Sequence, residues 1–194
     1  VAYAEGKSSE PPSYPGIPDK QLRDIIETNQ LKIQRERGSH VTLLSPRASG
    51  MGHHVPGLSV AKEWSRLSND NVGRIVDMFP DNFAAVCQLP QTVDGDLSDV
   101  IEELERCVES GFVGCNLNPD PSGGRWSAPP IYDPWWDPMW EAMVALRVPA
   151  MIHVSSSCER CLHMTGAHYI NADTAVFMQL IQGELFERHP ELKL

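Results

Sequence analysis

The sequence predicts an α/β protein in which strand–helix units repeat along a parallel sheet. Apolar segments at 41–45, 83–89, 112–117 and 148–154 alternate with segments of helical periodicity. These segments recur every roughly 30–40 residues, a spacing typical of βα units. They carry apolar residues on both faces, as parallel strands do when both sides of their sheet are covered.

The predicted helices are placed by the spacing of their apolar residues and by the residues at their ends. The first begins near Asp19 and ends before Gly38. The clearest pattern puts Val100, Leu104 and Val108 on one face. Helices are expected over 19–37, 59–79, 97–110, 137–147 and 172–188.

Both ends of the sequence suggest that the functional unit extends further. Residues 1–17 are rich in Ser, Pro and Gly and are expected to form a loop or arm. The chain begins at Val1 rather than Met, and another strand is expected to begin at Leu192. We therefore expect residues 1–194 to form a single partial domain.

The composition indicates which partners the protein is expected to bind and in which cellular compartment it is expected to lie. Lys and Arg number 16 against 26 Asp and Glu, so the formal net charge is −10 and nucleic acid is not an expected partner. No apolar run approaches the length of a membrane span and no signal peptide is recognisable, so no membrane association is expected. Five cysteines, an odd number in no dense framework, favour reduced thiols and a cytoplasmic setting.

The segment 148–154 is the most informative because it delivers a histidine at the end of a strand. In a (β/α) barrel, chemistry lies at the carboxyl ends of the strands, where His153 could bind a metal or move a proton. A structural histidine held by a backbone hydrogen bond is the alternative. No Gly-rich phosphate fingerprint follows the first predicted strand, so a doubly wound nucleotide-binding sheet is less favoured than a barrel.

Polar residues after the earlier strands suit an anionic ligand. The guanidinium of Arg47 could bind a carboxylate through two parallel hydrogen bonds, although a surface role is the commoner fate of an arginine. Small neighbours such as Ser49 leave room for a ligand. Asn116 and Asn118 share one side of their strand by the two-residue period. We expect Asn116 in the pocket and Asn118 in a turn.

The segment after His153 is expected to be a loop at the rim of the site. It carries His163, His168 and Tyr169. It also holds the CxxC motif of Cys158 and Cys161. A redox motif would need a helix starting at the first cysteine, and a zinc knuckle would need a second pair. A pair of loop thiols is therefore favoured.

Three segments, 45–49, 111–124 and 151–173, carry a likeness to known proteins. The second contains the run Asn-Leu-Asn-Pro-Asp-Pro, which is specific. Together they resemble the 4-oxalomesaconate hydratase family, in the amidohydrolase-2 branch of the amidohydrolase superfamily. The resemblance covers nearly the whole chain. It implies part of a metal-dependent-hydrolase type (β/α)8 TIM barrel, comprising strands two to five and the start of six.

The resemblance implies a hydro-lyase that adds water to the C=C of an oxo-tricarboxylate in protocatechuate degradation. It implies a divalent metal, with Zn²⁺ expected, and makes His153 the ligand from the fifth strand. The family's His-x-His pair and its later acidic ligand are not in this chain, so the chain alone is expected to be inactive. A small anionic carboxylate is the implied substrate, and a homo-oligomer is expected. The implied substrate-binding residues are Arg47, Ser49, Asn116, Ser155 and Tyr169, with His168 and Tyr169 as candidates for proton transfer.

Two alternatives stay open. The same branch holds metal-dependent decarboxylases of unsaturated or aromatic carboxylates, in which the metal would bind substrate oxygens rather than generate hydroxide. The other alternative is a non-catalytic fragment of the same fold.

Overall fold

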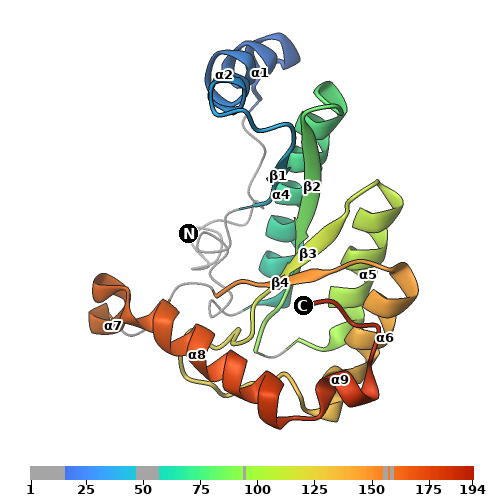
Figure 1. The fold of residues 1–194 in the computed structure, drawn as a ribbon, viewed down its shortest axis with the longest axis vertical. Helices are drawn as coiled ribbons and strands as arrows, with labels where there is room; N and C mark the ends of the chain where they lie inside the picture. Colours follow the sequence, from blue (N-terminus) through green and yellow to red (C-terminus); the bar gives the residue numbers. More distant parts are fainter. Residues whose placement is uncertain (1–15, 47–56, 94, 155–156, 158–159) are drawn as a thin grey trace.

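The computed structural model describes residues 16–46, 57–93, 95–154, 157 and 160–194. Its centre is a four-stranded parallel sheet in the order β1-β2-β3-β4, so each strand pairs with the next strand along the chain (Figure 1). The helices that connect successive strands make this arrangement possible, because parallel neighbours need a crossover. The strands are β1 Thr42–Leu44, β2 Phe83–Gln88, β3 Gly114–Leu117 and β4 Ala150–Ile152.

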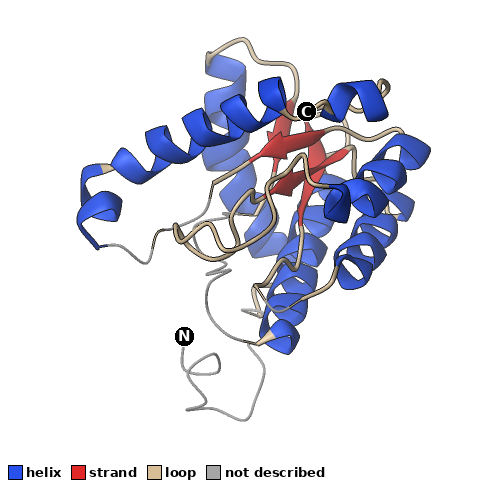
Figure 2. Ribbon diagram, turned by 90° about the horizontal axis from the view of Figure 1, so that it is seen from below, coloured by secondary structure: helices blue, strands red, loops and turns tan. Residues whose placement is uncertain are grey.

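The main helices pack against one face of the sheet (Figures 1 and 2). Helix α4 (Leu58–Met78) joins β1 to β2, and α5 (Leu97–Glu109) joins β2 to β3. Helix α6 (Asp137–Leu146) leads into β4. Within the described residues, every helix is too short or too polar to span a bilayer. The remaining helical segments are α1 (Asp19–Ile26), η1 (Glu27–Leu31), α2 (Lys32–Glu36), η2 (Pro134–Trp136), α7 (Arg160–Thr165), α8 (Ala167–Gln182) and α9 (Leu185–Arg188).

The two faces of the sheet differ sharply in burial. Side chains that alternate along the strands toward the helices, such as Cys87 and Leu117, are fully buried in the main apolar core. The residues between them face the other way, and there Leu43 is 64% and Met151 is 53% exposed. Helices thus cover one face of the sheet, while the other face is exposed at Leu43 and Met151 and buried at Gln88 and Asn116; we call it the open face.

The predicted order of elements is confirmed, with corrections after β4. The helix predicted over 172–188 begins earlier, at Ala167, and stops at Gln182, with α9 following as a separate turn. The predicted loop before it contains α7, because Gly166 adopts a left-handed backbone (φ 71°) that ends one helix and starts the next. The strand predicted from Leu192 does not form within the described residues. A single bond, from the Ala150 N–H to the Lys193 carbonyl (3.0 Å), links that segment to β4.

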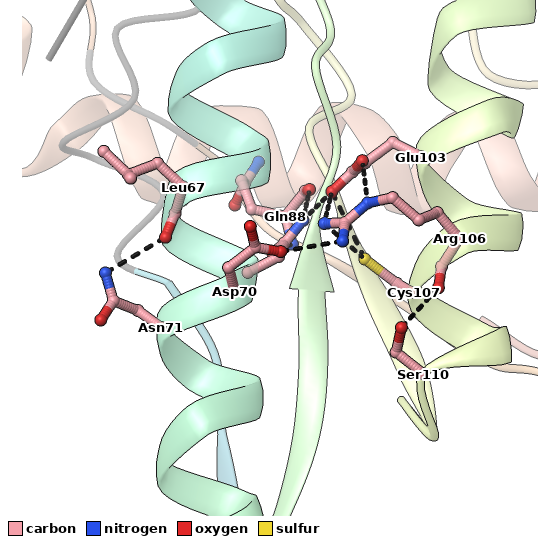
Figure 3. Close-up of polar contacts among 9 residues, drawn as sticks. Leu67, Asp70, Asn71, Gln88, Glu103, Arg106, Cys107 and Ser110 are labelled. Carbon is pink, nitrogen blue, oxygen red and sulfur yellow. Dashed lines mark hydrogen bonds and ion pairs between the residues drawn. The ribbon is translucent and has the colours of Figure 1, made fainter. Parts of the chain in front are cut away.

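One polar cluster ties α4, β2 and α5 together beneath the apolar core (Figure 3). The side-chain oxygen of Asn69 accepts from the backbone N–H of Gln88 (2.8 Å). The side-chain nitrogen of Asn69 donates to the backbone carbonyl of Gln88 (2.9 Å) and to the carboxylate of Glu103 (2.6 Å). Arg106 donates to both carboxylate oxygens of Glu103 (2.8 Å each) and to Asp70 (2.8 Å). Each carboxylate oxygen of Glu103 therefore has a donor, and the end of β2 is fixed to two helices.

A close contact joins the loop before α6 to the end of α8. A β-carbon at Gly183 would overlap the ring of Tyr132, so this position admits only glycine while Tyr132 keeps its place. Arg188 donates to the Tyr132 carbonyl (2.6 Å) and to Asp137 (3.1 Å), which holds the same loop from α9. The carboxylate of Asp137 also lies 2.9 Å from Nε2 of His189.

Candidate active site

The carboxyl ends of parallel strands meet at one edge of the sheet, and His153 lies at that edge. It directly follows β4, and its backbone N–H donates to the Leu117 carbonyl (2.8 Å), so the strand pairing continues for one more residue. By alternation its side chain shares the open face with Met151, opposite Ala150 and Ile152, which pack in and against the core. The imidazole is half-buried.

The ring contacts of His153 suit a metal ligand. Its Nδ1 lies 3.3 Å from the Val154 carbonyl. With the proton on Nδ1, that atom donates to the carbonyl and Nε2 keeps a free lone pair. Metal-bound histidines commonly donate their second N–H to such an acceptor. Among the described residues, no three His, Cys, Asp or Glu side chains gather into a metal site.

Asn116 presents an unpaired amide on the same open face. It lies in β3 in register with Met151 and with Gln88 of β2. It is fully buried, and neither its amide oxygen nor its amide nitrogen has a hydrogen-bond partner within the described part of the chain. A buried amide without partners costs on the order of 1–3 kcal/mol, so a ligand that pairs with it would recover that free energy.

Asn118 behaves as the sequence predicts, as a turn residue. Its side-chain oxygen accepts from the backbone N–H of Asp120 (3.2 Å), which opens the loop after β3. The side-chain amide of Gln91 donates to its carbonyl (2.8 Å) and accepts from its N–H (2.7 Å). The side chain of Gln91 thus makes the two hydrogen bonds with the backbone of Asn118 that a neighbouring strand would make. This role of Gln91 could not be read from the sequence, where a glutamine soon after a strand is the available signal.

His168 and Tyr169 lie in the first turn of α8 rather than in a loop, which corrects the prediction. His168 is buried, and its ring centroid is 5.7 Å from that of Tyr169. A β-carbon built on Gly124 would come within 3.3 Å of the His168 ring and 2.9 Å of the Ser157 hydroxyl. The loops after β3 and β4 therefore meet at His168. Arg47, Ser49 and Ser155 lie outside the described residues, as does the side chain of His163.

Residues 12–194 match the model of a protein family that is described as Amidohydrolase. The chain belongs to the amidohydrolase family. It is 53% identical over all its 194 residues to 2-keto-4-carboxy-3-hexenedioate hydratase of Sphingobium sp. (strain NBRC 103272 / SYK-6), of which it covers 56%.

Two solved structures show the same fold. The 4-oxalomesaconate hydratase from Rhodopseudomonas palustris is 47% identical, with a TM-score of 0.80 over 91% of this chain and 49% of its own. A dihydroxybenzoic acid decarboxylase from Polaromonas sp. JS666, with bound manganese, is 25% identical, with a TM-score of 0.71 over 91% of this chain and 57% of its own. The sheet is thus part of an amidohydrolase TIM barrel, and the chain spans about half the length of these relatives.

Proposed function

We propose that this chain forms part of the catalytic barrel of a hydratase that adds water across the C=C of an oxo-tricarboxylate such as 4-oxalomesaconate, in protocatechuate degradation. The observation that carries the proposal is the 53% identity over the whole chain to a hydratase. The position of His153 at the carboxyl edge of the sheet agrees with it, because barrel enzymes place their chemistry there.

His153 would hold a divalent cation through Nε2, with Nδ1 hydrogen-bonded to the Val154 carbonyl. Zinc is our proposed metal, since an imidazole ligand suits it, and a related decarboxylase holds manganese. When bound, such a cation lowers the pKa of water and makes it nucleophilic near neutral pH. The chain's own contribution is to fix the imidazole in one tautomer on the open face.

The substrate would be held through its carboxylate and carbonyl oxygens. The amide of Asn116 has an unused donor and an unused acceptor among the described residues, and both suit a substrate oxygen or hydroxyl. Arg47 would pair with a carboxylate, which an acidic chain with a formal charge of −10 would otherwise repel. The remaining proposed substrate contacts are Ser49, Ser155 and Tyr169.

Hydration adds hydroxyl to one alkene carbon and a proton to the other, and releases no other product. His168 and Tyr169 are our candidates for the proton transfer, because they lie together at the start of α8, beside the loop after β3. A decarboxylase is the second candidate function, and it rests on the weaker likeness of 25% identity. We also propose a homo-oligomer and a cytoplasmic location.

The test uses the polypeptide encoded by the complete open reading frame, loaded with zinc or with manganese. We expect the oxo-tricarboxylate to gain the mass of one water, and the product to take its new oxygen from ¹⁸O-labelled solvent, without release of CO₂. Release of CO₂ from an unsaturated or aromatic carboxylate, with no gain of water, would favour the decarboxylase. Inertness of the metal-loaded protein toward both would favour a non-catalytic role. Size-exclusion chromatography with light scattering measures the oligomeric state.

A further inference from the structure

The loop after β3 is organised by one buried carboxylate. Asp120 accepts from the backbone N–H of Ser122 (3.0 Å) and from its hydroxyl, and its second oxygen accepts from the N–H groups of Gly124 (2.7 Å) and Trp126 (3.2 Å). Asp120 is 3% exposed. These donors are all uncharged groups of the loop that contains Asp120, so its negative charge serves to collect backbone N–H groups.

The base of this loop is fixed independently. The Gln91 amide pairs with the backbone of Asn118 in both directions, and Asn118 in turn accepts from the Asp120 N–H. Both Gln91 and Asn118 are buried. The carboxylate of Asp120 therefore acts from a rigid base on the segment beyond it, residues 121–126.

Within that segment, Gly124 lies against the ring of His168. The backbone of Gly124 (φ 99°) is hydrogen-bonded to Asp120, and it packs so closely on the His168 ring that a β-carbon would lie 3.3 Å from Cε1 and 3.5 Å from Nδ1. The φ of 99° also disfavours any side chain here. His168 is 4% exposed, so its ring is confined by its surroundings, and the Gly124 backbone forms one wall of that space.

We propose that Asp120 is a positioning residue that fixes the imidazole of His168 at the rim of the active site, acting through the backbone of Gly124. The inference rests on the proposed function only where turnover is measured. The position of the His168 ring is a property of the fold and can be followed without substrate. Asp120 itself neither touches substrate nor moves a proton in this scheme.

The test compares Asp120→Asn with Gly124→Ala in the product of the complete reading frame. An asparagine keeps the shape of Asp120 but turns an NH₂ group toward backbone N–H donors, so the loop must shift. Histidine side chains labelled with ¹³C give one Cε1–H resonance each. His168→Gln assigns the resonance of His168.

We expect both variants to shift the His168 resonance and to lower kcat about 10- to 100-fold, with KM changed less than about threefold, because a displacement near 1 Å costs on the order of 100-fold. Asp133→Asn is the matched control. Asp133 lies on the same connection and accepts from the Trp135 N–H (2.9 Å), but it is only partly buried and caps η2. It should leave both readouts unchanged.

An unmoved His168 resonance in Asp120→Asn and Gly124→Ala overturns the proposal, whatever happens to kcat. A shifted resonance with unchanged kcat also overturns it, because His168 would then have no use for its position. Should Asp120→Asn fail to fold, an unmoved His168 resonance in Gly124→Ala still overturns the proposal. If the wild type hydrates nothing, the proposed function fails, while the resonance still decides whether Asp120 positions the ring.

Discussion

Glu103 and Asp120 are both buried carboxylates, but their partners differ in kind. Glu103 accepts from the guanidinium of Arg106 and from Asn69, and so joins α5 to α4 and β2. Asp120 accepts from backbone N–H groups of a single loop at the carboxyl edge of the sheet. The region around Glu103, on the helix-covered side, is a charge-paired structural joint. At the rim beside Asp120, the side-chain amide of Asn116 instead has no hydrogen-bond partner among the described residues.

The difference teaches that burial alone does not identify a functional polar group. In the Glu103 cluster the carboxylate accepts from Arg106 of its own helix and from Asn69 of α4, and Arg106 also donates to Asp70 of α4, which stabilises the fold. At the rim, the amide of Asn116 lacks partners among the described residues, and such an imbalance is expected where a ligand completes the pairing. Substitutions in the first region should therefore change stability, and substitutions at the rim should change turnover.

The largest expected effect is at His153. In the product of the complete reading frame, His153→Ala should reduce metal content and lower kcat/KM by more than the roughly 10- to 100-fold typical for loss of a group that only supports a ligand. Stability without metal should change little, because the ring is half-buried and faces the open side of the sheet. Elemental analysis and steady-state kinetics measure the two effects. Full metal content in the variant would leave His153 a structural residue.

Glu103→Ala should produce the largest loss of stability without a matching loss of turnover. It leaves Arg106 and Asn69 without their shared acceptor, which should cost about 2–4 kcal/mol of unfolding free energy. Urea unfolding measures the loss, and kcat per folded molecule should stay within about twofold. The double variant Glu103→Ala with Arg106→Ala should cost less than the sum of the two single changes.

Asn116→Leu should separate stability from function at the rim. Removing an unpaired buried amide should raise the unfolding free energy of the ligand-free protein by about 1 kcal/mol. Loss of the proposed substrate contact should lower kcat/KM about 10-fold. Thermal melts and kinetics on the same preparations test both signs. Lower stability with unchanged kinetics would place Asn116 among the structural residues.

The smallest expected effect is the acid dependence of the Glu103 cluster. Burial raises the pKa of Glu103, but hydrogen bonds from Arg106 and Asn69 and the charge of Arg106 lower it, and the net pKa lies below its ordinary value of 4.5. The stabilisation is therefore complete above about pH 4.5 and is lost as pH falls through the lowered folded-state pKa. Each tenfold change in the acid constant is worth about 1.4 kcal/mol. The urea unfolding midpoints of wild type and Glu103→Gln should be measured from neutral to acid pH. They should differ near neutral pH and become equal in acid.

Much of the fold is readable from the sequence because its signals are local. The strands and the helix at 97–109 follow from apolar periodicity, and the parallel order follows from the alternation of strands and helices. The segment after β4 was predicted less well. Gly166 and the polar residues near it are typical of a loop, yet tertiary packing of His168 and Ala172 places the residues on both sides of Gly166 in helices.

The candidate site was only partly readable for a different reason. His153 and Asn116 follow from their place at strand ends, since the two-residue period assigns each a face. Gln91, Asp120 and Gly124 could not be assigned roles. Their importance comes from contacts between successive loops, and sequence spacing does not report which loop backbones touch.

The contact of Gly183 with Tyr132 has a consequence for sequence divergence. No residue with a β-carbon fits at position 183 while an aromatic ring occupies position 132, so the two positions cannot drift independently. The added carbon would lie 2.2 Å from Cβ of Tyr132 as well as from its ring, so a smaller side chain at 132 removes only part of the overlap and the backbone of that loop must also move. Related sequences should therefore show glycine at 183 wherever the loop at 132 keeps its path.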